Sequence, residues 1–117
     1  MKLKVIPTLR EKKRYVVFKV YSSDTIEYDE FRNAAINVML KWMGEKGFGE
    51  ANIKFIKNLW NEKEMVGFVK CSTRYVHDVK FAFGLLRQVG DAKVLVRTVL
   101  VSGTISSAKR KLKNIKI

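Results

Sequence analysis

Residues Arg14–Tyr21, with the sequence RYVVFKVY, form the stretch that decides the fold. The stretch is rich in β-branched and aromatic side chains, and it alternates, with Val16, Phe18 and Val20 on one side. The other side carries Tyr15, Val17, Lys19 and Tyr21. This alternation predicts a β-strand with one apolar face and one mixed face.

Apolar periodicity predicts the remaining elements that follow this strand. A first helix is expected after the acids of residues 24–30, and the glycines of residues 44–49 should end it. The expected strands are 14–21, 52–60, 65–72 and 93–101, and the expected helices have apolar faces over 31–43, 76–86 and 104–117. The second and third strands are separated by a short polar loop, which favours an antiparallel pair.

The order β-α-β-β-α-β followed by a helix predicts an α/β (α+β) sandwich of the ferredoxin-like, RRM-like kind. We expect a four-stranded antiparallel sheet plus a C-terminal helix. Residues 1–13 are interpreted as a basic N-terminal arm, and residues 14–117 as a single domain that includes the basic C-terminal helix 104–117. Two helices on one face of the sheet leave the other face open, so something must cover that face or bind to it.

The charge of the chain is unusual in its size and in its placement. The chain has 117 residues, 47% of them hydrophobic, which is enough for one domain with its own core. Its formal net charge is +13; residues 1–14 carry six basic side chains and one acid, and residues 104–117 carry five basic side chains and no acid. The segment between them has a net charge of only +3. Two basic ends indicate a polyanionic partner, either nucleic acid or an anionic membrane.

The basic side chains of the two ends are the candidates for contacts with RNA phosphates. They are Arg10, Lys12, Lys13, Arg14, Lys109, Arg110, Lys111 and Lys113. Such contacts release counterions, so the affinity would fall steeply with salt. In other interpretations the final helix lies on an anionic membrane, or the lysine surplus reflects thermal adaptation. The apolar residues of that helix favour packing on the domain over membrane insertion; they are Ile105, Ala108, Leu112 and Ile115.

Patterns typical of catalysis or metal binding are missing from the sequence. Cys71 is the single cysteine and His77 the single histidine, so neither an internal disulfide nor a zinc cluster is expected. We expect no catalytic residue, no metal site and no cofactor bound by this chain. Gly103 and Thr104 could hold a phosphate at a helix start, but simple capping is the favoured interpretation. We expect no signal peptide, no membrane span and a cytoplasmic protein.

Three segments together resemble a known family. They are PTLREKKRY at Pro7–Tyr15, VGFVKC at Val66–Cys71 and VSGTI at Val101–Ile105. In this order they resemble archaeal ribonuclease P protein component 2, a small-subunit family shared with eukaryotic ribonuclease P and ribonuclease MRP. The resemblance implies a non-catalytic subunit of an endoribonuclease, whose RNA removes the 5′ leader of precursor tRNA with magnesium ions.

The resemblance also implies the partners and the fold. The partners are ribonuclease P RNA, the TIM-barrel-like protein component 3, other ribonuclease P proteins, and precursor tRNA as the substrate of the whole particle. The resemblance allows a homodimer within a heterotetramer, and it implies no membrane and the same sandwich fold. Two alternatives stay open: a stand-alone RNA-binding or chaperone protein without a role in tRNA 5′ maturation, and a small ferredoxin-like hydrolase with its own anion site.

Overall fold

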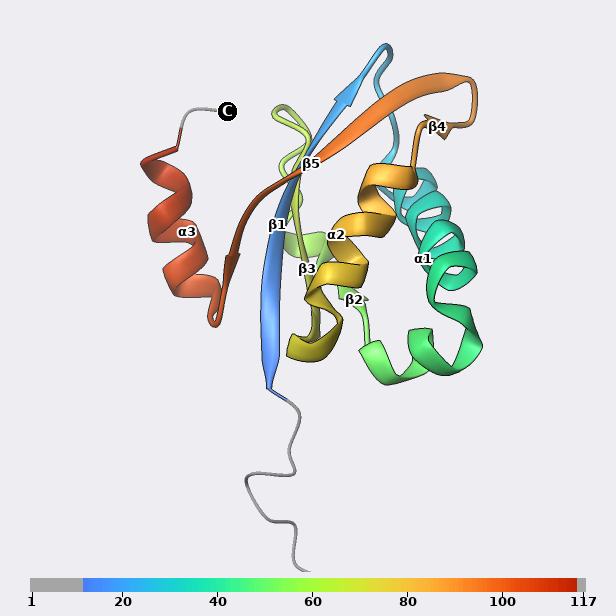
Figure 1. The fold of residues 1–117 in the computed structure, drawn as a ribbon. Helices are drawn as coiled ribbons and strands as arrows, with labels where there is room; N and C mark the ends of the chain where they lie inside the picture. Colours follow the sequence, from blue (N-terminus) through green and yellow to red (C-terminus); the bar gives the residue numbers. More distant parts are fainter. Residues whose placement is uncertain (1–11, 116–117) are drawn as a thin grey trace, which may run out of the picture.

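The computed structural model describes residues 12–115, which form a mixed α/β fold with a curled sheet and three α-helices (Figure 1). The strands are β1 (Lys13–Ser22), β2 (Lys54–Phe55), β3 (Val66–Ser72), β4 (Gln88–Val89) and β5 (Ala92–Ser102). The helices are α1 (Tyr28–Ala51), α2 (Val76–Leu85) and α3 (Ile105–Lys113), with short 3-10 turns η2 (Lys57–Leu59) and η3 (Thr73–Tyr75). Residues 1–11 of the expected arm lie outside the described residues, so its division from the domain stays a prediction.

The predicted first strand is the middle strand of the sheet. The strand order is β2-β3-β1-β5-β4, and every pair of neighbours is antiparallel. The predicted alternation is confirmed, because Val16, Phe18 and Val20 enter the larger core cluster while Val17 enters the smaller one on the opposite side. β1 therefore separates two apolar layers.

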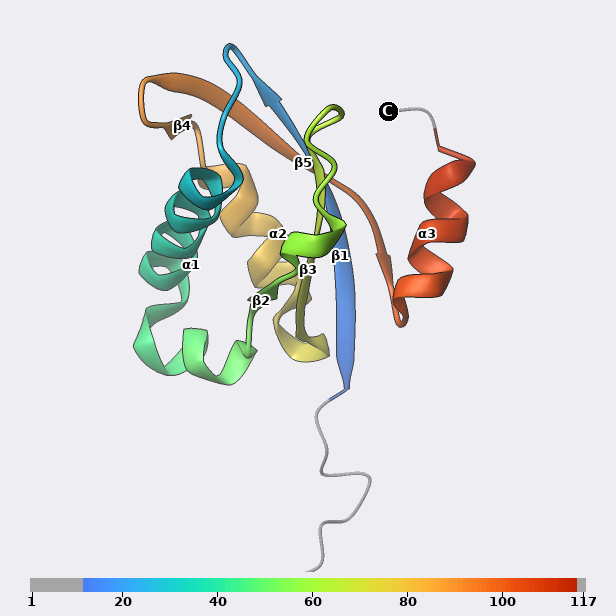
Figure 2. The same cartoon turned by 180° about the vertical axis from the view of Figure 1, so that it is seen from behind.

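The two faces of the sheet are covered by different helices (Figures 1 and 2). α1 and α2 lie on one side, which we call the helical face, and bury Phe31 and Phe83 against the sheet. α3 lies on the other side, which we call the α3 face, and buries Ala108 against Val17 and Phe68. The sheet face that the sequence left open is thus partly covered by the chain's own last helix.

Aromatic packing under the helical face fixes β1 against α1 and α2. The Phe18 ring lies 4.8 Å from the Phe83 ring and 5.4 Å from the Phe31 ring, measured between centroids. Trp60 extends the cluster, with its centroid 6.1 Å from that of Phe31. Centroid separations in this range are those of favourable aromatic pairs, so the cluster adds to the burial of apolar area.

The expected strand over residues 52–60 is wrong except at Lys54–Phe55. Asn52 has a left-handed backbone with φ 50°, and its N–H donates to the Gly49 carbonyl, which ends α1. After β2 the chain turns into η2, which brings the Trp60 ring to 5.2 Å from the Tyr28 ring. The strand therefore ends early because the chain turns to pack the Trp60 ring against Tyr28. The expected antiparallel pairing of this strand with β3 is confirmed.

Two further differences from the expected elements involve glycines. Gly44, with φ 76° and ψ 170°, ends the first helical segment of α1 within the expected range 44–49, but a second segment over residues 45–51, which was not expected, follows it directly. The sheet has five strands in place of four, because β4 forms a short hairpin with β5 across Gly90, which has φ 58°. A two-residue strand is too short to show alternation in a sequence.

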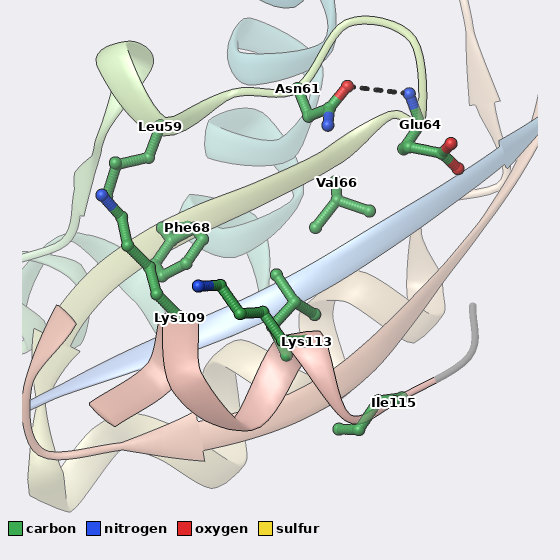
Figure 3. Close-up of a pocket in the computed structure, with 9 residues that line it drawn as sticks. Leu59, Asn61, Glu64, Val66, Phe68, Lys109, Lys113 and Ile115 are labelled. Carbon is green, nitrogen blue, oxygen red and sulfur yellow. Dashed lines mark hydrogen bonds between the residues drawn. The ribbon is translucent and has the colours of Figure 1, made fainter. Parts of the chain in front are cut away.

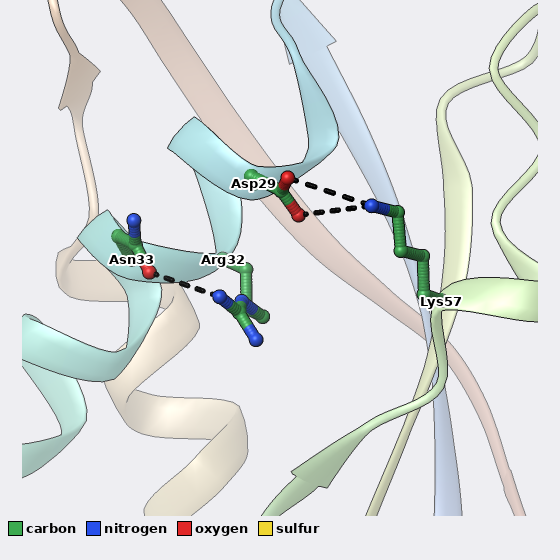
Figure 4. A network of polar contacts seen from close by, with 4 residues as sticks. All are labelled: Asp29, Arg32, Asn33 and Lys57. Carbon is green, nitrogen blue, oxygen red and sulfur yellow. Dashed lines mark hydrogen bonds and ion pairs between the residues drawn. The ribbon is translucent and has the colours of Figure 1, made fainter.

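An ion pair joins the start of α1 to η2, the 3-10 turn that follows β2 (Figure 4). The Lys57 amino group of η2 lies 3.4 Å from each carboxylate oxygen of Asp29. One turn along, Arg32 donates to the Asn33 side-chain oxygen at 3.4 Å. These groups are mostly solvent-exposed, so their contribution to stability is small.

Candidate nucleic-acid interface

α3 presents a basic surface to solvent because its apolar side is packed on the sheet. Ile105, Ala108 and Leu112 recur every three or four residues and contact the cluster around Val17 and Phe68. The predicted cations of the helix are all exposed; they are Lys109, Arg110, Lys111 and Lys113. The expected packing of this helix on the domain is therefore confirmed, and its basic side is available to a partner.

A side-chain cap fixes the first turn of α3. The Thr104 hydroxyl oxygen accepts a hydrogen bond of 3.1 Å from the backbone N–H of Ser107. The Thr104 N–H in turn donates to the Ser102 hydroxyl at 3.4 Å. The simple capping interpretation is thus confirmed, and the cap sets the direction in which α3 leaves β5.

The pairing of β1 with β5 brings the start of β1 beside the turn into α3. Tyr15, near the start of β1, lies directly opposite Ser102, the last residue of β5. The Arg14 guanidinium reaches the turn into α3, where its Nη1 lies 3.8 Å from the point that a Cβ on Gly103 would occupy. The beginning of β1 and the beginning of α3 are therefore neighbours.

Three of the four N-terminal residues predicted to contact RNA phosphates fall within the described residues, at the start of β1. Lys12 and Lys13 are exposed, and Arg14 is half-buried and donates to the Lys13 carbonyl at 3.0 Å. The Lys12 carbonyl accepts two hydrogen bonds of 2.8 Å from Thr73, through its N–H and its hydroxyl. Arg10 lies outside the described residues. Of the described N-terminal candidates, Arg14 reaches the turn into α3, while Lys12 and Lys13 lie at the start of β1.

Two lysines that the sequence analysis did not select belong to the same surface. Lys54 of β2 lies opposite Lys70 of β3, and Lys70 lies opposite Tyr15 of β1. Alternation places all three on the α3 face, since Val17 and Phe68 of the same strands pack under α3. Only the register of β2 against β3 and of β3 against β1 could have identified these two lysines, and the sequence does not determine that register.

Acidic side chains of the two helices α1 and α2 lie on the other side of the molecule. Asp29 and Glu50 belong to α1, and Asp78 belongs to α2, where it accepts a 3.0 Å hydrogen bond from the Trp42 indole. The Tyr75 hydroxyl donates to the Glu50 carboxylate and thereby lowers the pKa of that carboxyl. These acids therefore lie on the helical face, away from the cations of the α3 face.

An apolar groove of about 550 Å³ runs between α3 and the strands beneath it (Figure 3). Its floor includes Val66 and Phe68 of β3, and Lys109 and Lys113 stand at its side on α3. The remaining lining residues are Leu59, Asn61, Glu64, Leu112 and Ile115. The groove lies next to the lysines of the α3 face, so basic and apolar surfaces are continuous there.

Comparison with known proteins decides the family. Residues 14–113 match the Rpp14/Pop5 family. The chain belongs to the Rpp14/Pop5 family. It is 38% identical over 105 residues to the ribonuclease P protein component 2 of Pyrococcus furiosus, covering 90% of this chain and 86% of that protein. With the protein of the same name from Pyrococcus abyssi the identity is 38% over 112 residues, covering 95% and 93%.

A solved structure shares the fold of this Rpp14/Pop5 chain. A chain of yeast ribonuclease MRP, determined by cryo-electron microscopy, superposes with a TM-score of 0.62 at 12% sequence identity. The superposition covers 91% of this chain and 98% of that chain. The family resemblance of the three sequence segments is therefore confirmed by the family match, and the arrangement of helices and strands by a solved structure.

Among residues 12–115 there is no group of three or more histidine, cysteine, aspartate or glutamate side chains that could hold a metal ion. Cys71 is buried, and desolvation raises the pKa of its thiol to about 11, so it stays protonated and unreactive at neutral pH. In the same residues, no helix combines the length and the apolar character needed to span a membrane.

An exposed apolar patch on the helical face differs from the basic α3 face. It consists of Trp42 of α1 with Phe81 and Leu85 of α2, whose exposed fractions are 46%, 50% and 47%. The Trp42 and Phe81 rings contact each other with centroids 4.3 Å apart. We call these three residues the α1–α2 patch. Clustered exposed apolar side chains of this size are typical of protein–protein contacts.

Proposed function

We propose that this chain is a protein subunit of ribonuclease P, the ribonucleoprotein that removes the 5′ leader of precursor tRNA. The observation that carries the proposal is the match of residues 14–113 to the Rpp14/Pop5 family together with relatives named ribonuclease P protein component 2. These alignments extend over nearly the whole chain. A stand-alone RNA-binding protein is not favoured, because both Pyrococcus relatives carry the name of a ribonuclease P subunit.

In this role the chain binds and supports the catalytic RNA, while the RNA carries out the hydrolysis with magnesium ions. Support for a non-catalytic subunit comes from the name of both Pyrococcus relatives, ribonuclease P protein component 2, which is that of one component of an enzyme. The RNA phosphates are contacted by the cations of the N-terminal segment and of α3. These are Arg10, Lys12, Lys13, Arg14, Lys109, Arg110, Lys111 and Lys113.

The same proposal assigns protein partners to the other side of the molecule. Protein component 3 and other ribonuclease P proteins, or a second copy of this chain in a homodimer within a heterotetramer, contact the α1–α2 patch. Support comes from the half-exposed Trp42 and Phe81 rings, which are removed from water when a partner covers them. Precursor tRNA is the substrate of the assembled particle, and the particle is cytoplasmic.

We also propose that the described domain is a ferredoxin-like unit with two additions. The strand order β2-β3-β1-β5, with α1 and α2 on one face, follows the β-α-β-β-α-β pattern. The two-residue β4 is then an extra hairpin on β5, and α3 is an extra helix on the other face.

Reconstituted cleavage of precursor tRNA tests the proposed function. Ribonuclease P RNA and the remaining protein subunits are combined with or without the full chain at low magnesium concentration, and the rate of leader removal is measured. We expect a clearly faster rate with the chain, because its cations neutralise RNA phosphates that magnesium would otherwise screen. Equal rates with and without the chain would contradict the proposal.

A polycation control separates a subunit from a general RNA chaperone. Polylysine of matched charge replaces the chain in the same reaction. We expect it not to restore the rate, because the proposed subunit depends on a shaped surface and on protein partners. If polylysine restores leader removal as well as the chain does, the chaperone interpretation replaces the subunit interpretation.

A further inference from the structure

Three side chains form a line across three neighbouring strands on the α3 face. Lys54 of β2 lies opposite Lys70 of β3, and Lys70 lies opposite Tyr15 of β1. Residues directly opposite in an antiparallel pair have Cβ atoms roughly 5 Å apart, so the three side chains are immediate neighbours. We call them the lysine–tyrosine row. The row lies two residues along β3 from Phe68, which forms part of the groove floor beside Lys109.

The two lysines of the row are an unfavourable pair by themselves. Like charges directly opposite on one face of a sheet destabilise the pairing. The amino groups of Lys54 and Lys70 have no hydrogen bond and no ion pair with any of residues 12–115, whereas the amino group of Lys57 is paired with Asp29. Lys13, on the same face beyond Tyr15, adds a third cation without an acidic partner in that part of the chain. An anion bound at the row would relieve this repulsion.

Tyr15 gives the row an aromatic ring. Tyr15 is half-buried, and its ring makes no ring–ring and no cation–π contact within residues 12–115. Tyr21, on the same strand and the same face, differs because the Lys19 amino group lies 5.5 Å from the centre of its ring. Among residues 12–115, no ring or cation therefore stacks on Tyr15.

We propose that the lysine–tyrosine row binds a nucleotide of single-stranded RNA. The base stacks on the Tyr15 ring, and Lys54 and Lys70 contact the flanking phosphates. An aromatic ring beside cations suits a nucleotide because every base has a π-face and every linkage carries a negative charge. This inference rests on the proposed RNA-binding function and adds a site on the sheet to the phosphate contacts of α3 and the N-terminal segment.

Binding of two RNA probes to the full chain tests the stacking on Tyr15. One probe is a labelled oligouridylate, and the other is an abasic oligomer with the same number of phosphates. We expect Tyr15→Leu to weaken oligouridylate binding by about tenfold, as for the loss of one stacked base, and to leave the abasic oligomer unaffected. Tyr15→Phe keeps the ring and should bind like the wild type. Tyr21→Leu is the matched control and should leave both affinities unchanged.

The lysines of the row are tested through the salt dependence of the same binding. We expect Lys70→Gln to lower the slope of log affinity against log salt by about one, the value for one phosphate that is no longer neutralised. It should also raise the midpoint of thermal unfolding, because the repulsion from Lys54 is removed. Lys80→Gln, at an exposed position of α2, is the control and should leave the slope unchanged.

Crosslinking of the wild-type chain tests RNA contact at Tyr15 without any substitution that could disturb the fold. Oligomers that contain 4-thiouridine are irradiated with the full chain, and the adducts are mapped by mass spectrometry. We expect an adduct on the tryptic peptide 15–19, which begins with Tyr15. Absence of that adduct, or a Tyr15→Leu variant that binds both probes like the wild type, would overturn the site.

The outcomes separate this site from the wider RNA-binding function. If substitutions in α3 weaken RNA binding while the row variants bind normally, only the lysine–tyrosine row is wrong. If the wild-type chain binds neither probe, the proposed RNA-binding function is wrong as well. Displacement of the RNA by a glutamate-rich peptide that depends on Lys54 and Lys70, but not on Tyr15, would assign the row to a protein partner and overturn the inference.

Discussion

Gly67 is where β3 and the aromatic cluster approach each other most closely. A Cβ at this position would lie 2.6 Å from Cζ of Phe18 and 2.9 Å from Cε3 of Trp60. Both rings are held by further aromatic neighbours, so neither can easily move aside. The requirement for glycine here comes from ring packing, since the backbone of Gly67 is that of an ordinary strand.

Gly67→Ala should lower the free energy of unfolding by about 1–3 kcal/mol, the usual cost of overpacking a core. Urea unfolding followed by tryptophan fluorescence measures the change, because Trp60 is part of the affected cluster. Gly84→Ala is the control, since nothing lies within 4 Å of a Cβ there and alanine favours the α2 helix, so the stability should rise by about 0.5–1 kcal/mol. Equal effects of the two substitutions would contradict the packing argument.

Elements with a regular local pattern could be predicted from the sequence. Alternation in β1 and the three-to-four residue spacing in α3 were sufficient, because each element buries one side along its whole length. The strand expected over 52–60 failed because Asn52 takes up a left-handed helix cap and Trp60 turns into the core. The Asn52 cap is local, since its N–H donates to Gly49, but the contact of Trp60 with Tyr28 joins residues distant in sequence, which no local pattern reveals.

In the candidate interface, too, residues marked by a local pattern could be predicted, and residues brought together by long-range pairing could not. The exposed cations of α3 were selected from the sequence because charge and amphipathicity are local properties. Lys54 and Lys70 were not selected, because only the register of β2 against β3 and of β3 against β1 brings them beside Tyr15. A register is set by turn geometry and core packing, so it could not be derived from composition or spacing.

The Thr104 cap should stabilise α3 without affecting the rest of the fold. Thr104→Ala removes the hydrogen bond from the Ser107 N–H and should destabilise α3 by about 1 kcal/mol. Amide hydrogen exchange should then be faster in α3 and unchanged in β1, because α3 buries few side chains and can open locally. Ser106→Ala is the control, since that exposed hydroxyl makes no hydrogen bond in the described residues. Faster exchange in both variants would contradict a specific cap.

For the molecule as a whole, the fold brings the start of β1 and the turn into α3 together. They are separated by most of the chain, yet the pair Tyr15 and Ser102 places Arg14 beside the turn into α3. Acids such as Asp29, Glu50 and Asp78 lie on α1 and α2. Among the described residues, α3 carries four cations and no acid, whereas α1 and α2 carry both signs, so the α3 side is the more positive one.

A polarised molecule should respond to the place at which charge is removed, and two triple variants test this. Each variant lowers the formal charge by three, one through Lys109→Gln, Arg110→Gln and Lys111→Gln, the other through Lys41→Gln, Lys46→Gln and Lys80→Gln on α1 and α2. We expect the α3 variant to lower the salt slope of RNA binding by about one for each phosphate that the helix no longer neutralises, and the control to leave the slope near the wild-type value. Equal reductions would mean that RNA senses only the total charge, because long-range attraction depends on net charge whereas counterion release requires direct contact.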